Sequence, residues 1–133
     1  MNSSRPKVVV LGAQGALGRL CVPALRRAGM DVVRAGRRAE SASDDADLVV
    51  SMVNDSSHIV ERFVLERGGA MLTAIVEPDQ RAELKALGSG AAGLVVTDVG
   101  LGPGVTSLVL ADLLDRHPEA DELEGAGTWS RHT

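Results

Sequence analysis

The chain has 133 residues, 44% of them hydrophobic and 24% charged, and a formal net charge of −4. This length supports one domain spanning residues 1–133 with its own core, but not a cofactor domain plus a full substrate domain. Two lysines and a 2% aromatic content exclude a basic stripe that follows a phosphate backbone and an aromatic platform that stacks bases, so we expect no nucleic-acid partner. No apolar run is long enough to cross a membrane or to form the core of a signal peptide. We therefore expect a cytoplasmic protein without membrane partners.

Residues 7–18, KVVVLGAQGALG, predict a strand that runs into a glycine-spaced turn opening a helix. The apolar run at 7–11 suits a central parallel strand with both faces covered. Gly12 would allow the tight turn, Gly15 would let backbone N–H groups approach phosphate oxygens, and Gly18 would let the helix lie close to the strand. This pattern is typical of a dinucleotide pyrophosphate site; the alternative is a turn whose glycines serve helix packing alone.

A helix is expected over residues 16–28, with Cys21 on its apolar face. Cys21 is the only cysteine, so no disulfide forms within one chain, and we interpret it as a core thiol rather than a catalytic one. Residues 31–38 predict a second strand that ends in a short basic turn, and residues 39–47 predict a loop or at most one helical turn.

Arg37 in that basic turn comes 19 residues after Gly18, at the position that usually reads the ribose of the cofactor. A carboxylate there would select NAD, whereas a guanidinium suits the 2′-phosphate of NADP. Arg38 is a second candidate contact. The alternative interpretation is a solvated basic turn.

Three further strands alternate with two helices. The strands are expected at residues 48–53, 70–76 and 93–99; one helix follows residues 54–57 and ends before Gly68, and the other runs from Pro78 to Gly88.

Residues 100–104 open a last helix over 105–116, which is apolar on most sides and is therefore expected to be buried. The tail at 121–133 predicts an edge strand around 123–129. Strands alternating with helices specify an α/β fold with a doubly wound, mostly parallel, Rossmann-like sheet, whose ligand lies beyond the carboxyl ends of the strands.

The candidate cofactor-binding residues all fall at such strand ends or on the first helical turn. They are Gly12, Gln14, Gly15, Ala16, Leu17, Gly18, Arg37, Arg38, Met52, Val53 and Asn54.

The chain resembles the saccharopine dehydrogenase family, specifically its N-terminal NADP-binding domain, over most of residues 7–130. The resemblance rests on Gly12–Gly18, on Ala35–Arg37, and on DVGLGPGV at Asp98–Val105 before the last helix. It implies NADP as the cofactor and hydride transfer from NADPH to an imine-like or conjugated carbon of an unknown substrate. Residues 47–55 also resemble the corresponding strand edge of hydroxyacid dehydrogenases.

Two departures from that family stand out. The strand and helix that usually follow the arginine turn are replaced by residues 39–47, so one strand-helix crossover is missing and the adenine pocket loses a wall. The substrate-binding domain is also absent, so catalysis would need a missing domain or a partner chain.

No catalytic constellation is evident. The chain has no tyrosine, which excludes the Tyr-x-x-x-Lys pair of short-chain reductases, and His58, His117 and His132 are too widely spaced for a metal site. Asp98 is interpreted as a residue that caps the following loop. Whether the chain is an enzyme stays open: the alternatives are a nucleotide-binding or sensing module without catalysis and a truncated remnant. A homodimer is expected if the last helix and tail need cover.

Overall fold

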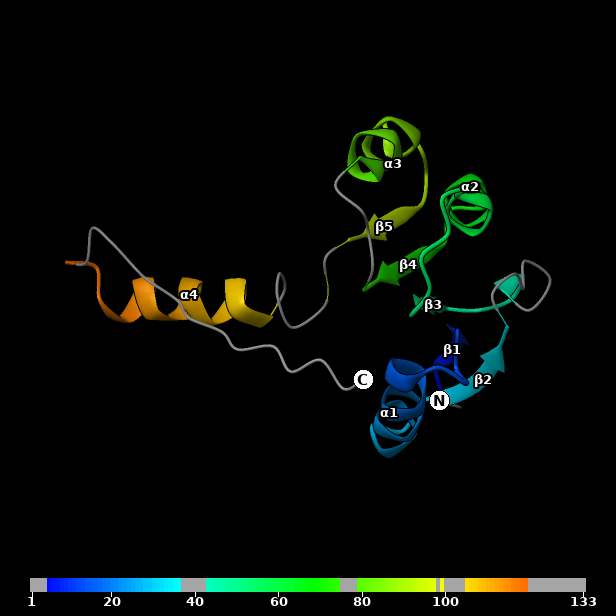
Figure 1. Cartoon of the computed structure of the whole chain (residues 1–133), viewed down its shortest axis with the longest axis horizontal. Helices are drawn as coiled ribbons and strands as arrows, with labels where there is room; N and C mark the ends of the chain where they lie inside the picture. The colour runs from blue at the N-terminus through cyan, green and yellow to red at the C-terminus, as the bar shows by residue number, and fades with distance from the viewer. Residues whose placement is uncertain (1–4, 37–42, 75–78, 98, 100–104, 120–133) are drawn as a thin grey trace, which may run out of the picture.

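The computed structural model describes residues 5–36, 43–74, 79–97, 99 and 105–119. Within these ranges strands and helices alternate along the chain, except that the connection between the second and third strands carries no described helix (Figure 1). The elements are β1 (Lys7–Leu11), α1 (Ala16–Arg27), β2 (Asp31–Ala35), β3 (Leu48–Ser51), α2 (Ile59–Glu66), β4 (Ala70–Thr73), α3 (Gln80–Gly88), β5 (Leu94–Val96) and α4 (Val105–Arg116).

The five strands form one sheet in the order β2-β1-β3-β4-β5, and every pairing is parallel. The expected α/β fold with a parallel, Rossmann-like sheet is therefore confirmed. The chain leaves β1 toward β2 on one side and later builds β3, β4 and β5 on the other side, so the order reverses between β1 and β3. All carboxyl ends lie at one edge, where this reversal opens a crevice for a ligand.

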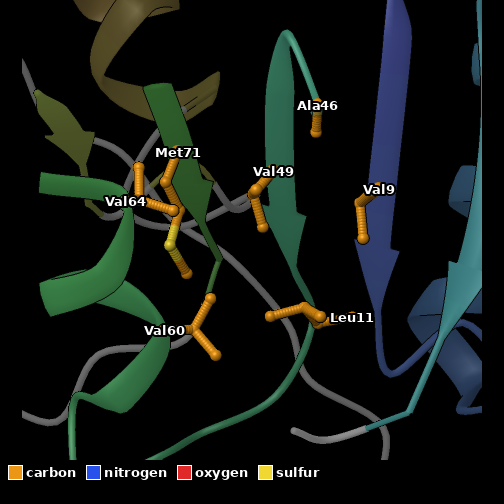
Figure 2. Packing of buried hydrophobic residues seen from close by; sticks show 7 residues of the cluster. All are labelled: Val9, Leu11, Ala46, Val49, Val60, Val64 and Met71. Carbon is orange, nitrogen blue, oxygen red and sulfur yellow. The ribbon is translucent and has the colours of Figure 1, made fainter. Parts of the chain in front are cut away.

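Alternate side chains of β1 point to opposite faces of the sheet, as the two-residue period of a strand requires. Val8 and Val10 pack toward α1 with Val22, whereas Val9 and Leu11 belong to the core beneath α2. Figure 2 shows Val60 and Val64 of α2 directed at the strand residues of this second core. Because both faces of β1 are covered, its apolar run is continuous instead of alternating.

The connection from β2 to β3 crosses β1 through residues 36–47, and its described part, residues 43–47, contains only a turn. Ser43 and Ala46 are nevertheless buried. Arg67, at the end of α2, donates hydrogen bonds to the backbone oxygens of Asp44 and Ala46, and Lys7 forms an ion pair with Asp45. These contacts hold residues 43–47 against the sheet.

The strands are shorter than expected at their carboxyl ends, because β3 stops at Ser51 and β5 spans only Leu94–Val96. Met52 and Val53 therefore lie in the turn after β3. Several sequence features lie outside the described residues: Arg37, Arg38, Pro78, Asp98, residues 100–104 and the tail at 121–133.

The expectation that the last helix is buried is wrong for the side chains that the structure describes. From Ala111 to Arg116 every side chain is exposed, and Val109 is 51% exposed. Figure 1 shows α4 projecting away from the sheet and the other helices. Apolar composition permits burial but does not cause it, since a helix buries side chains only where another element lies against it.

Candidate functional site

The glycine-rich turn after β1 has the geometry that its glycines predict. Gly12 has a φ of 71°, a left-handed conformation that costs glycine little, and its carbonyl accepts a hydrogen bond from the N–H of Gly15 at 2.9 Å. A Cβ on Gly12 would lie 2.5 Å from Cγ1 of Val53. Gly12 is therefore needed both for the turn and for the close approach of the turn after β3.

Gly18 lets α1 begin directly against this turn. A Cβ at Gly18 would lie 2.2 Å from the Gly12 carbonyl oxygen and 2.6 Å from the Cα of Ala13, both backbone atoms that cannot move aside. Packing thus explains Gly12 and Gly18 without any ligand.

Gly15 is different, because packing does not require it. A Cβ there would meet only the Gly12 carbonyl oxygen, at 3.3 Å, and the residue is exposed. It is the middle glycine, the one whose missing side chain would give phosphate oxygens access to the backbone. A turn shaped only for packing would not need a glycine at this position.

Gly15 is also the N-cap of α1, and no side chain caps this helix end or places an acidic group in its first turn. The first N–H groups of a helix have no partner within it and carry part of a positive charge, which suits an anion. Arg19 donates from Nε to the backbone oxygen of Gln14 at 2.8 Å, so its guanidinium is held beside the turn. The helix start therefore presents backbone donors and an arginine on the same side.

A cavity of about 490 Å³ opens beside this turn, within the size range of ligand pockets. Its walls come from the glycine turn, the end of β2 and the turn after β3, which places it at the reversal of strand order between β1 and β3. The lining residues are Gly12, Gln14, Gly15, Ala35, Gly36, Met52, Val53 and Asn54.

The third wall is shaped by the end of β3. The N–H of Met52 donates to the Leu11 carbonyl at 3.1 Å, which continues the pairing of β3 with β1 beyond the strand. The buried Ser51 hydroxyl donates to the carbonyl of Val53 at 3.1 Å. These bonds fix the turn so that Met52 and Val53 face the glycine turn across the cavity.

Six of the predicted site residues line this cavity, and they are Gly12, Gln14, Gly15, Met52, Val53 and Asn54. Ala16, Leu17 and Gly18 form the first turn of α1, beside the cavity but not among its lining residues. Arg37 and Arg38 lie outside the described residues. Ala35 and Gly36 also line the cavity; the sequence placed them in the motif that ends at Arg37 but not among the candidate binding residues. Arg19 was not anticipated beside the turn.

Two titratable side chains, His58 and Glu61, lie at the start of α2, outside this cavity. His58 is buried with a φ of 51°, and its Nε2 lies 3.4 Å from Oε2 of Glu83 in α3. Burial raises the pKa of the Glu61 carboxyl, against a smaller opposing effect of His58. Glu61 was not anticipated, because an acidic residue in a first helical turn normally faces water.

Neither His58 nor Glu61 lines the cavity, and the eight lining residues include no ionisable side chain. Cys21 is partly buried against the core beneath α1, and desolvation raises its pKa, which favours an inert thiol. In the ranges that the structure covers, no three His, Cys, Asp or Glu side chains are placed to hold a metal ion, and no helix is long and apolar enough to span a bilayer.

The fold and this crevice define a class: an α/β protein with a Rossmann-like parallel sheet and a glycine-lined cavity at its switch point. No protein-family model and no curated protein sequence matches the chain.

Proposed function

We propose that the chain is the NADP-binding domain of an oxidoreductase similar to the saccharopine dehydrogenases. The observation that carries the proposal is the cavity at the switch point, whose walls are the glycine turn, the end of β2 and the turn after β3. Gly15, for which packing gives no reason, faces this cavity.

The residues present fit the parts of a dinucleotide. The pyrophosphate would lie against Gly15 and the first N–H groups of α1, with Arg19 nearby to balance its charge. Met52 and Val53 offer an apolar wall for a ring of the cofactor. Arg37 directly follows Gly36, a lining residue, in the sequence, and a guanidinium suits a 2′-phosphate.

When bound, NADPH would supply the hydride. The residues of this chain would bind and orient the cofactor, because none of the lining side chains that the structure describes can donate or accept a proton by ionising. The substrate and its proton source would then come from a partner chain or a further domain.

That same lack of ionisable lining residues favours a second candidate: a nucleotide-binding or sensing module that performs no chemistry. Addition of candidate partners to the NADPH-loaded chain separates the two, since only the first predicts oxidation of NADPH, visible as a loss of its absorbance.

The binding step is tested by calorimetric titration of NADPH into the wild type and a Gly15→Asp variant. The added carboxylate would face the phosphates, so we expect affinity to fall about tenfold or more. Gly88→Asp is the matched control, because a Cβ at Gly88 meets nothing within 4 Å, at the end of α3. Equal affinities for both variants, or no binding by a folded wild type, would overturn the proposal.

A further inference from the structure

A second cavity, of about 420 Å³, lies between α3 and β5 at the outer end of the sheet. It shares no lining residue with the glycine-lined cavity, and β3 and β4 separate β5 from β1 in the strand order. Figure 1 shows α3 beside β5 at this end of the sheet. The volume is within the range of small-molecule sites, and the walls determine which ligand chemistry the cavity accepts.

The floor of this cavity is apolar. Leu65 near the end of α2 and Leu84 in α3 line it, and they are only 4% and 6% exposed. Val95, at the centre of β5, is partly buried and also packs against the core beneath α2. Aliphatic side chains from three elements thus offer a surface on which an apolar group would be removed from water.

The wall formed by α3 carries positive charge. Four of its residues line the cavity at i, i+3, i+4 and i+7 spacing, which places them on one face of the helix, and they are Arg81, Leu84, Lys85 and Gly88. Lys85 forms no ion pair with any residue that the structure describes. Its ammonium group is therefore a candidate partner for an anion beside the apolar floor.

No acidic side chain is among the described lining residues of this cavity. Glu83 is the acidic residue of α3, but it lies two positions from both Arg81 and Lys85 and so on another side of the helix. There its Oε2 lies 3.4 Å from Nε2 of His58, which is buried at the start of α2. The carboxylate of α3 is thus directed at α2, and it does not neutralise Lys85.

We propose that this cavity binds a small amphipathic carboxylate, whose apolar body lies on Leu65, Leu84 and Val95 and whose carboxylate lies at Lys85. An inorganic anion alone would leave the apolar floor in contact with water, and a neutral apolar molecule would form no bond with the ammonium group. A carboxylate with an aliphatic chain suits both walls, through a charge-assisted hydrogen bond and through burial of apolar surface. This inference does not depend on the cofactor or on the proposed oxidoreductase activity.

Octanoate is the probe, and its binding to the full chain is followed by the amide shifts in proton–nitrogen correlation spectra. We expect saturable shifts at Leu84, Lys85 and Val95 and none at Gly15, which lies in the other cavity. Octanamide has the same chain without the charge, and acetate has the same charge without the chain, so each should bind about tenfold more weakly or worse. Shifts confined to other elements, or equal affinities for octanoate and octanamide, would overturn the proposal.

A charge reversal tests the role of the ammonium group. Lys85→Glu should weaken octanoate binding about tenfold or more, because a carboxylate would then face the carboxylate of the probe. Arg34→Glu is the matched control, since it makes the same change in net charge on β2, at the opposite edge of the sheet, and should leave the affinity unchanged. Equal losses in the two variants would mean that Lys85 does not bind the probe.

Filling the cavity tests its shape. A Cβ at Gly88 meets nothing within 4 Å, so the side chain of Gly88→Leu would occupy cavity space and should lower octanoate affinity about tenfold or more. Leucine is a better helix former than glycine, so the fold should be kept, which circular dichroism checks. Ser89→Leu, exposed and outside the lining, is the matched control. If Gly88→Leu binds octanoate as tightly as Ser89→Leu, the proposal is wrong; if Gly88→Leu does not fold, Lys85→Glu at its exposed position decides.

Discussion

Helices α1 and α4 have the same length and both contain several aliphatic residues, yet among the side chains of these two helices that the structure describes, only those of α1 take part in the core. Gly18 and Val22 of α1 are buried against the glycine turn and the sheet, whereas the described side chains of α4 are exposed. The difference lies in contacts rather than composition. Gly18 lets α1 start within van der Waals distance of the turn after β1, and no described residue gives α4 a comparable attachment.

The comparison also shows how the candidate site is built. The short, rigid path from β1 into α1 fixes the helix end that faces the cavity.

The largest loss of stability is expected from a substitution that separates α1 from the glycine turn after β1. Gly18→Val should destabilise the fold by several kcal/mol, since its side chain would overlap backbone atoms of Gly12 and Ala13. Gly88→Val, in open space at the end of α3, should cost about 1 kcal/mol or less. Urea unfolding followed by circular dichroism measures both, and similar costs would contradict the packing role of Gly18.

A matched pair of valine truncations tests burial directly. Val22→Ala on α1 should cost about 2 kcal/mol, because the side chain is 5% exposed and its removal leaves a cavity. Val109→Ala on α4 should change the free energy of unfolding by about 0.5 kcal/mol or less, measured on protein dilute enough to be monomeric. Equal costs would mean that α4 is packed as firmly as α1.

Arg67 holds the short connection between β2 and β3, and Arg67→Met should cost about 1 to 2 kcal/mol because the backbone oxygens of Asp44 and Ala46 lose their donor. Hydrogen exchange should then speed up at residues 43–47. The exposed Arg116→Met in α4 is the control; if it destabilises as much as Arg67→Met, Arg67 is not a structural tether.

The smallest effect comes from a buried charge. Glu61→Gln should stabilise the fold by about 1 kcal/mol at neutral pH, since burial of the carboxylate is unfavourable. Because burial raises the pKa of the Glu61 carboxyl in the folded state, ionised Glu61 lowers the stability of the wild type at pH values above the ordinary carboxyl pKa. The stability gained by Glu61→Gln should therefore shrink as the pH falls through the raised pKa, and it should vanish below both the raised and the ordinary pKa. A stability gain for Glu61→Gln that is present at acid pH and lost at neutral pH would have the wrong sign and would contradict this prediction.

Most of the fold was predictable because its signals are local. The apolar run of β1, the glycine spacing and the apolar period of α2 each determine an element within a few residues. The cavity was predictable for the same reason, since it is formed by strand ends.

The parts that the sequence did not reveal depend on tertiary contacts. The exposure of α4 depends on the absence of a neighbour, and the burial of Glu61 and His58 depends on how α2 packs toward α3. The hydrogen bond from Arg19 Nε to the Gln14 carbonyl is local, spanning five residues, but no spacing rule in the sequence predicts it. None of these contacts produces a periodic pattern of residues in the sequence.

The central claim, that the cavity holds a dinucleotide with a 2′-phosphate, is tested most directly by calorimetric titration of NADPH and NADH into the wild type and an Arg37→Asp variant. We expect the wild type to bind NADPH more tightly, and the variant to lose that preference because a carboxylate repels the 2′-phosphate and accepts the ribose hydroxyls. A folded wild type that binds neither nucleotide, or a preference that Arg37→Asp leaves unchanged, would contradict the account.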